Sequence, residues 1–108
     1  MPNPLLQNQA NNQAAAESNQ PIKHRPLYDI AREIRQHWPM PYFGVRPYLT
    51  ALLSLDQISD TYGQDSALSI VRYLLSNAST WRGPEARRIK AELNTIVRVY
   101  RKAHPQAY

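Results

Sequence analysis

The sequence predicts an all-α fold, a compact bundle of about four helices behind a disordered N-terminal tail. Apolar residues recur at helical spacing in four successive segments, and the three glycines all fall between those segments. No stretch alternates apolar and polar residues between turn signals, as a β-strand would. Four helices with short connections pack as a bundle, so the pattern alone indicates the fold class.

The first 22 residues differ in composition from the rest of the chain. Nine of them are Asn or Gln, three are Pro, and Glu17 is the only charged side chain. Such a segment buries too little apolar surface to offset its ordering entropy. We therefore expect a disordered tail at 1–22, with a binding arm that folds on a partner as the alternative. Residues 23–104 are expected to form a single helical domain, with a disordered end at 105–108.

The first two helices are predicted on either side of a proline-rich segment. One should run from Leu27 to about Trp38, since Pro26 suits a first helical turn and Pro39 disfavours helical geometry in the residue before it. Residues 39–46 cannot be regular helix and are unusually apolar and aromatic for a loop. The second helix should run from Pro47 to about Tyr62, where Gly63 is the expected left-handed stop. Its predicted apolar face is Tyr48, Ala51, Leu52, Leu55, Ile58 and Tyr62.

Two further helices are predicted in the second half of the chain. The third should begin at Gln64 or Asp65 and end near Asn77, with Ala67, Ile70, Val71, Leu74 and Ala78 on its apolar stripe. The fourth should run from Pro84 to about Ala103, with Ile89, Leu93, Ile96 and Tyr100 facing inward. Glu85 in its first turn and Arg101 and Lys102 in its last suit the helix dipole.

The formal net charge of +5 is unevenly distributed. Residues 48–66 contain three aspartates and no basic residue, whereas the predicted fourth helix is rich in arginine. At about 100° per residue, the face opposite Ile89 and Leu93 carries Arg87, Asn94, Arg98 and Arg101, with Lys102 beside them. Such a face is typical of a protein that binds a phosphate backbone, and the alternative is a solvated face that keeps the bundle soluble. The nucleic-acid-binding candidates are Arg82, Arg87, Arg88, Arg98, Arg101 and Lys102.

The sequence offers little for catalysis. There is no cysteine, no nucleophile elbow, no phosphate-binding loop and no dinucleotide fingerprint. Glu33 and His37 lie four residues apart on the first helix, but a metal needs at least a third ligand and none stands at an expected spacing. An exposed helix pair is the simpler interpretation. We therefore expect a protein that is not an enzyme, with no catalytic residue, metal or cofactor.

The most individual local pattern is the segment 81–88, Trp-Arg-Gly-Pro-Glu-Ala-Arg-Arg. It places an aromatic residue and three arginines at a helix N-terminus, where free amide groups favour anions. The alternative is that Trp81 fills the core at the turn while Gly83 and Pro84 redirect the chain. Pro84 also removes one of the amide groups that an anion would use.

The apolar loop provides a second candidate surface, for a protein partner, through Met40, Tyr42 and Phe43. An exposed apolar patch rimmed by polar residues would favour this interpretation, and buried loop aromatics would favour the nucleic-acid one. A membrane is not expected as a partner, because no run approaches the roughly 18 apolar residues of a spanning helix. Nothing at the N-terminus predicts a signal or transit peptide, so we expect a cytoplasmic protein in the producing or host cell.

Several short motifs stand out between about Leu27 and Leu93, among them Tyr42-Phe43-Gly44, Tyr62-Gly63-x-Asp65-Ser66, Leu75-Ser76-Asn77-Ala78 and Trp81-Arg82-Gly83. They resemble motifs of small uncharacterised helical proteins encoded by bacteriophages and mobile genetic elements. The resemblance implies a phage or mobile-element setting and carries no activity or site. Two functions remain open: a non-enzymatic accessory protein that binds nucleic-acid backbone through the fourth helix, and an inhibitor or adaptor that binds a host protein through residues 40–43.

Overall fold

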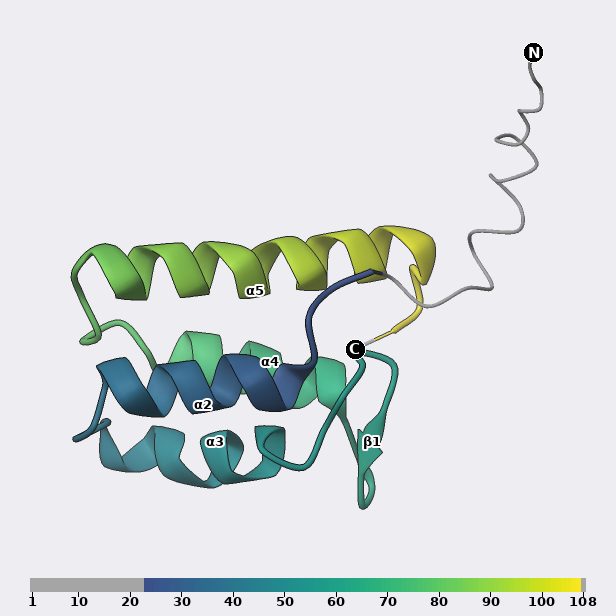
Figure 1. Cartoon of the computed structure of the whole chain (residues 1–108). Helices are drawn as coiled ribbons and strands as arrows, with labels where there is room; N and C mark the ends of the chain where they lie inside the picture. Colours follow the sequence, from purple (N-terminus) through teal and green to yellow (C-terminus); the bar gives the residue numbers. More distant parts are fainter. Residues whose placement is uncertain (1–22, 108) are drawn as a thin grey trace, which may run out of the picture.

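The computed structural model describes residues 23–107, and in this part of the chain four helices pack around one core (Figure 1). The predicted bundle is confirmed, although a two-stranded hairpin means that the chain is not strictly all-α. The predicted tail at 1–22 and the last residue, Tyr108, lie outside the described residues. The helices are α2 (Leu27–His37), α3 (Arg46–Leu52), α4 (Ala67–Ser76) and α5 (Pro84–Ala103), and a 3₁₀ turn, η1 (Phe43–Val45), leads into α3.

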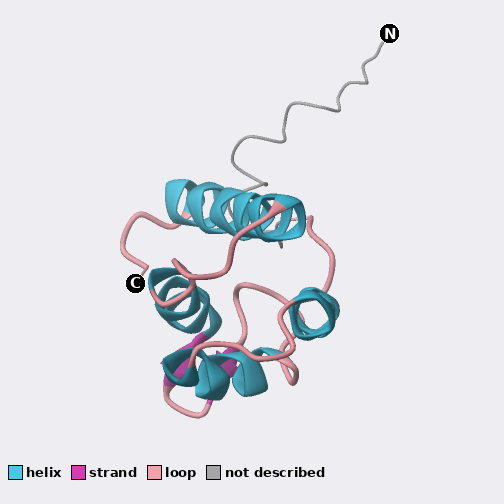
Figure 2. Ribbon diagram, turned by 90° about the vertical axis from the view of Figure 1, so that its left-hand side faces the viewer, coloured by secondary structure: helices cyan, strands magenta, loops and turns pink. Residues whose placement is uncertain are grey.

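The helices form a ring in which each packs on two neighbours. α2 contacts α3 and α5, and α4 contacts the same two helices from the other side. Figure 2 shows α5 and α3 at opposite edges of the bundle, with α2 and α4 between them. The connections at 38–45 and 77–83 lie at one end of the bundle, whereas the hairpin lies at the other (Figure 1).

The apolar stripes of α2, α4 and α5 point into the core, as the spacing predicts. Ile30 and Ile34 of α2 and Ile89 and Leu93 of α5 are completely buried. All five residues predicted for the stripe of the third helix are buried as well. At roughly 25 cal/mol per Å² of apolar surface removed from water, these stripes supply the main driving force for folding.

The second helix is shorter than predicted, and this prediction was wrong over its second half. α3 ends at Leu52, and the strands β1 (Thr61–Tyr62) and β2 (Asp65–Ser66) pair as an antiparallel hairpin, with Tyr62 opposite Asp65. Gly63 has the expected positive φ of 62°, but it serves the hairpin turn and not a helix end. The absence of strands was therefore also predicted wrongly.

The segment between α3 and β1 leaves helical geometry because its backbone has other partners. The carbonyl oxygens of Leu55 and Asp56 accept hydrogen bonds from the amides of Tyr28 and Leu27, at 2.9 and 2.8 Å. These amides belong to the first turn of α2, where a helix has no acceptors of its own. The carboxylate of Asp60 accepts from the amides of Asp56 and Gln57. Side chains of this kind compete with helix formation, so a turn replaces the predicted helix.

α4 begins two to three residues later than predicted because Ser66 caps it. The Ser66 hydroxyl accepts a hydrogen bond from the amide of Ser69 at 3.0 Å. A serine cap satisfies one of the free amide groups at a helix N-terminus, and this fixes the start of the helix at Ala67.

The domain continues to Ala107 at its C-terminal end. The amide of Ala107 donates to the carbonyl of His104 at 2.9 Å, and its side chain packs against the core. The described residues therefore extend the folded domain three residues past the predicted boundary at 104. Among the helices of residues 23–107, none is long and apolar enough to cross a membrane.

Candidate binding surfaces

The outer face of α5 carries the basic residues that the sequence predicts there. This face is defined here by Arg87, Arg98, Arg101 and Lys102, all of which are exposed. Within residues 23–107, none of the four makes an ion pair. From Arg87 to Lys102 the helix rises about 22 Å, at 1.5 Å per residue. The opposite face of α5 is buried against α2 and α4, so the positive charge is one-sided.

The other basic residues of α5 are occupied within the fold. Arg88, which the sequence grouped with the nucleic-acid-binding candidates, donates to the carboxylates of Glu33 and Glu85. Lys90 lies on the flank of the helix, and its Nζ donates to the carbonyl oxygens of Ala78 and Trp81 at 2.8 and 2.6 Å. Lys90 therefore holds the connection between α4 and α5, a role that the sequence pattern did not indicate.

Charged side chains join α2 to α5 along a seam, defined here by Arg25, Glu33, Glu85, Arg88 and Glu92. The guanidinium of Arg25 donates to both oxygens of Glu92, at 2.8 and 2.9 Å, and to Glu33 at 2.6 Å. Hydrogen bonds from Arg88, and then from Arg25, hold the pKa of the Glu33 carboxyl below its ordinary value of 4.5. The Glu92 carboxylate, ahead of Glu33, raises the pKa of Arg25. The seam is partly exposed, so solvent weakens each pair.

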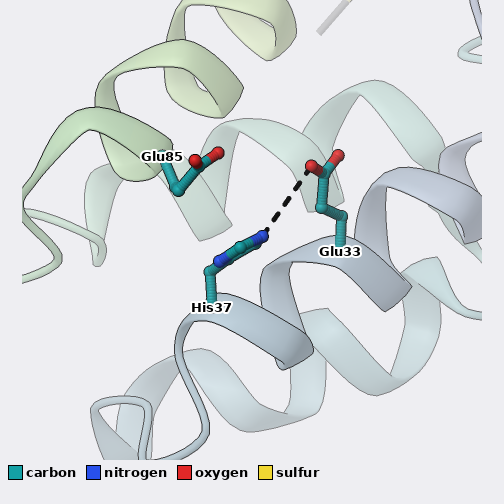
Figure 3. Close-up of side chains that lie close together, drawn as sticks. All are labelled: Glu33, His37 and Glu85. Atoms are coloured by element: carbon teal, nitrogen blue, oxygen red, sulfur yellow. Dashed lines mark ion pairs between the residues drawn. The ribbon is translucent and has the colours of Figure 1, made fainter.

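The structure adds a third group to the pair of Glu33 and His37 on α2. Glu85 in the first turn of α5 approaches them, and the ligand atoms of the three residues lie within 4.8 Å of one another (Figure 3). His37 Nε2 is 4.0 Å from a Glu33 oxygen. Sequence spacing could not indicate Glu85 as a neighbour of this pair, because it lies about 50 residues further along the chain.

This triad nevertheless carries no metal assignment. Arg88 contacts the carboxylates of both Glu33 and Glu85, so a divalent cation would have to displace its guanidinium from both. Glu33 is also paired with Arg25. Carboxylates that already have charged partners gain less from a cation, so the arrangement acts as a structural ion-pair network.

Trp81 fills the core, as the alternative for the segment 81–88 proposed. It is 4% exposed and stacks on Trp38, with ring centroids 5.3 Å apart and planes only 3° from parallel. Gly83 adopts a φ of 110°, which strongly favours glycine, and it redirects the chain into α5. Arg82 remains exposed beside this turn. The two tryptophans therefore tie the end of α2 to the start of α5.

The loop residues proposed for partner binding are exposed. Met40 is 79% exposed, Phe43 80% and Tyr42 55%, so none of them contributes much to the core. By the criterion set out for the sequence, this exposure favours a protein partner for the loop, whereas the arginines on the outer face of α5, which have no ion pair among the described residues, favour nucleic acid. A cleft of about 590 Å³ lies beside them, between the end of α2 and α3. It is lined by Arg35, Trp38, Pro39, Pro41, Arg46, Leu49, Thr50 and Leu53.

Two of the three histidines, His24 and His104, have ring nitrogens within hydrogen-bond distance of backbone groups. His24 Nδ1 lies 2.7 Å from the carbonyl oxygen of Arg25, and its Nε2 accepts from the amide of Ile58 at 3.2 Å. His104 stacks on Tyr100 with ring centroids 4.3 Å apart. His24 thus links the segment before α2 to the turn after α3, which the sequence spacing could not reveal.

Comparisons with protein-family models, with curated proteins and with solved structures find no match to this chain.

Proposed function

We propose that this protein is a non-enzymatic accessory protein that binds the phosphate backbone of nucleic acid through the outer face of α5. The observation that carries the proposal is the separation of the basic residues of α5 into two groups. Arg88 and Lys90 have partners within the fold, whereas the four residues of the outer face have no ion pair among the described residues. A cation without an ion pair gives up only water when it binds phosphate oxygens, so its binding costs no interaction within the fold.

The spacing of the outer face also suits a polyanion. Duplex DNA presents one negative charge per roughly 1.7 Å of helix axis, so a stripe of about 22 Å meets several phosphates in any register. Contacts of this kind position a protein on the backbone without reading base sequence. Arg88 is left out of the proposed set, because its transfer to phosphate would break its pairs with Glu33 and Glu85.

The resemblance to phage and mobile-element proteins supports a setting in which a small protein works beside DNA in a bacterial cytoplasm. The net charge of +5 supports the same partner, because it steers polyanions toward the molecule.

The test is a titration of duplex DNA at several salt concentrations. Four phosphate contacts predict a slope of log K against log salt of roughly −3.6, at −0.9 per contact. In the variant with Arg98→Ala, Arg101→Ala and Lys102→Ala, the slope should become shallower by about one unit per lost contact, with no change in sequence preference.

A charge-matched control separates the outer face from net charge. The variant with Lys23→Ala, Arg32→Ala and Arg72→Ala also removes three exposed positive charges, but none from α5. It should retain most of the salt dependence. Equal losses in the two variants, or no binding of the wild type at low salt, would overturn the proposal.

A further inference from the structure

We infer that the end of the bundle around residues 38–43 is a second nucleic-acid site, one that selects single strands by stacking unpaired bases on Phe43 and Tyr42 while Arg35 and Arg46 contact the phosphates. This inference rests on the proposed function, because it assumes nucleic acid as the partner. It adds a preference for single-stranded over double-stranded nucleic acid, which the outer face of α5 does not determine.

The loop restricts the backbone that carries both rings, and it holds the Tyr42 ring in place. Pro39 and Pro41 restrict the backbone before Tyr42, and the carbonyl of Tyr42 accepts from the amide of the buried Val45 at 2.9 Å. The Tyr42 ring lies against Gly44, where an added Cβ would come within 2.7 Å of it. A rigid ring loses little entropy when a base stacks on it, so the loop is prepared for a planar ligand.

The charged residues that line the cleft beside the rings are both arginines. Arg35 at the end of α2 and Arg46 at the start of α3 line the cleft next to the loop, and its lining contains no carboxylate. Neither arginine makes an ion pair within the part of the chain that the structure describes. The exposed Arg82 belongs to the connection 77–83, which lies at this same end of the bundle (Figure 1). The nearby carboxylate of Glu85 is paired with Arg88. A ligand of this surface must therefore combine negative charge with flat apolar faces.

Single-stranded nucleic acid meets both requirements, and a duplex does not. Proteins that bind single strands combine a basic groove with aromatic side chains on which successive bases stack. In a duplex the base faces are already stacked on one another, so exposed rings gain nothing from them. The acidic residues Asp56 and Asp65 belong to the turn and hairpin at the other end of the bundle, where they do not oppose a phosphate chain (Figure 1).

Trp38 provides a direct readout of this site. It lines the cleft and stacks on the buried Trp81, and these are the two tryptophans of the chain. A strand in the cleft should therefore quench the tryptophan fluorescence of the full chain.

The experiment compares an oligothymidylate of about ten nucleotides, within the site sizes of single-strand binders, with a duplex of the same length. The wild type should bind the single strand more tightly. Phe43→Ala should weaken single-strand binding about tenfold, the value of roughly one stacked base, and leave duplex binding unchanged. Phe43 is 80% exposed, so its loss should not disturb the fold. Tyr62→Ala removes an exposed ring from the hairpin at the other end and should have no effect.

The other outcomes separate a failure of this inference from a failure of the proposed function. Equal affinity for both strand types, insensitive to Phe43→Ala but reduced by the α5 variant, would overturn this inference and leave the proposed function standing. No binding of either nucleic acid at low salt would overturn both. Met40→Ala provides the last control, because a thioether offers no flat face for a base. If it weakened single-strand binding as much as Phe43→Ala, general apolar contact and not stacking on a flat ring would account for the affinity, and the inference would fail.

Discussion

The two long sides of α5 carry similar basic residues and put them to different uses. On the side toward α2, Arg88 contacts Glu33 and Glu85, and Glu92 is paired with Arg25. On the outer face, Arg87, Arg98, Arg101 and Lys102 have no ion pair among residues 23–107. The seam uses its charges to fix one helix against another, and the outer face keeps its charges available.

This difference shows why the charge of a helix is a poor measure of its capacity to bind. Arg87 and Arg88 are neighbours in the sequence, yet only Arg88 reaches the carboxylates of α2. An arginine that leaves a carboxylate for a phosphate exchanges one charged partner for another and gains little. An unpaired arginine gains the whole interaction and releases counterions as well.

The largest expected effect is a loss of stability when α5 no longer packs fully on the core, since both of its sides depend on that packing. Leu93 is completely buried where α5 packs on the core. Leu93→Ala should lower the free energy of unfolding by about 2–5 kcal/mol, because it removes apolar contacts and leaves a cavity. Chemical denaturation measures this loss. A wild-type transition midpoint would mean that α5 does not pack as described, and the distinction between its two sides would then have no basis.

A smaller loss is expected in the seam itself. Glu33→Gln keeps the size of the side chain but leaves Arg25 and Arg88 each without one charged partner. The free energy of unfolding should fall by about 1 kcal/mol, the scale of a partly exposed charged hydrogen bond. Thermal denaturation gives the measurement, and Asp65→Asn, at an exposed position in the hairpin, is the matched control that should show no loss.

The pH dependence of this loss has a definite sign. The pKa of Glu33 is lowered by Arg88 and Arg25 in the folded chain, from its ordinary value of 4.5. Its contribution to stability is therefore complete above about pH 4.5 and disappears as the pH falls through the lower folded pKa. The gap in stability between the wild type and Glu33→Gln should close below pH 4.5. A gap that stays constant in acid would assign the effect to packing and not to charge.

The sequence predicted most of the fold because three of the four helices have strong local signals. α5 runs from Pro84 to Ala103 as expected, since proline and the dipole-matched charges mark its ends. The segment after Leu52 has no such signal. Its carbonyl groups bind the first turn of α2, about 28 residues earlier in the chain, and His24 binds the amide of Ile58. A periodic pattern of apolar residues continues through the segment because Leu55 and Ile58 are buried, although they are not helical.

The sequence could predict which residues share a surface, but not which of them form ion pairs within the fold. Helical geometry placed the outer face of α5 correctly, since it depends on one element alone. The seam joins residues up to 67 positions apart, so no spacing rule could show that Arg88 is occupied. The exposure of Phe43 also required the structure, because an aromatic residue beside prolines is equally compatible with a buried turn.

The smallest expected effect is on the stability of the variant with Arg98→Ala, Arg101→Ala and Lys102→Ala. Its melting temperature should stay within about 3 °C of the wild type, because surface substitutions without partners cost little. Two small terms oppose each other. Losing cations near the C-terminus of α5 weakens their interaction with the helix dipole, and losing like charges relieves repulsion. If this variant melted below Glu33→Gln, the outer face would be holding the helix in place, and a loss of DNA affinity in the same variant would reflect unfolding. An unchanged melting temperature with a shallower salt slope would assign the outer face to binding and the seam to the fold.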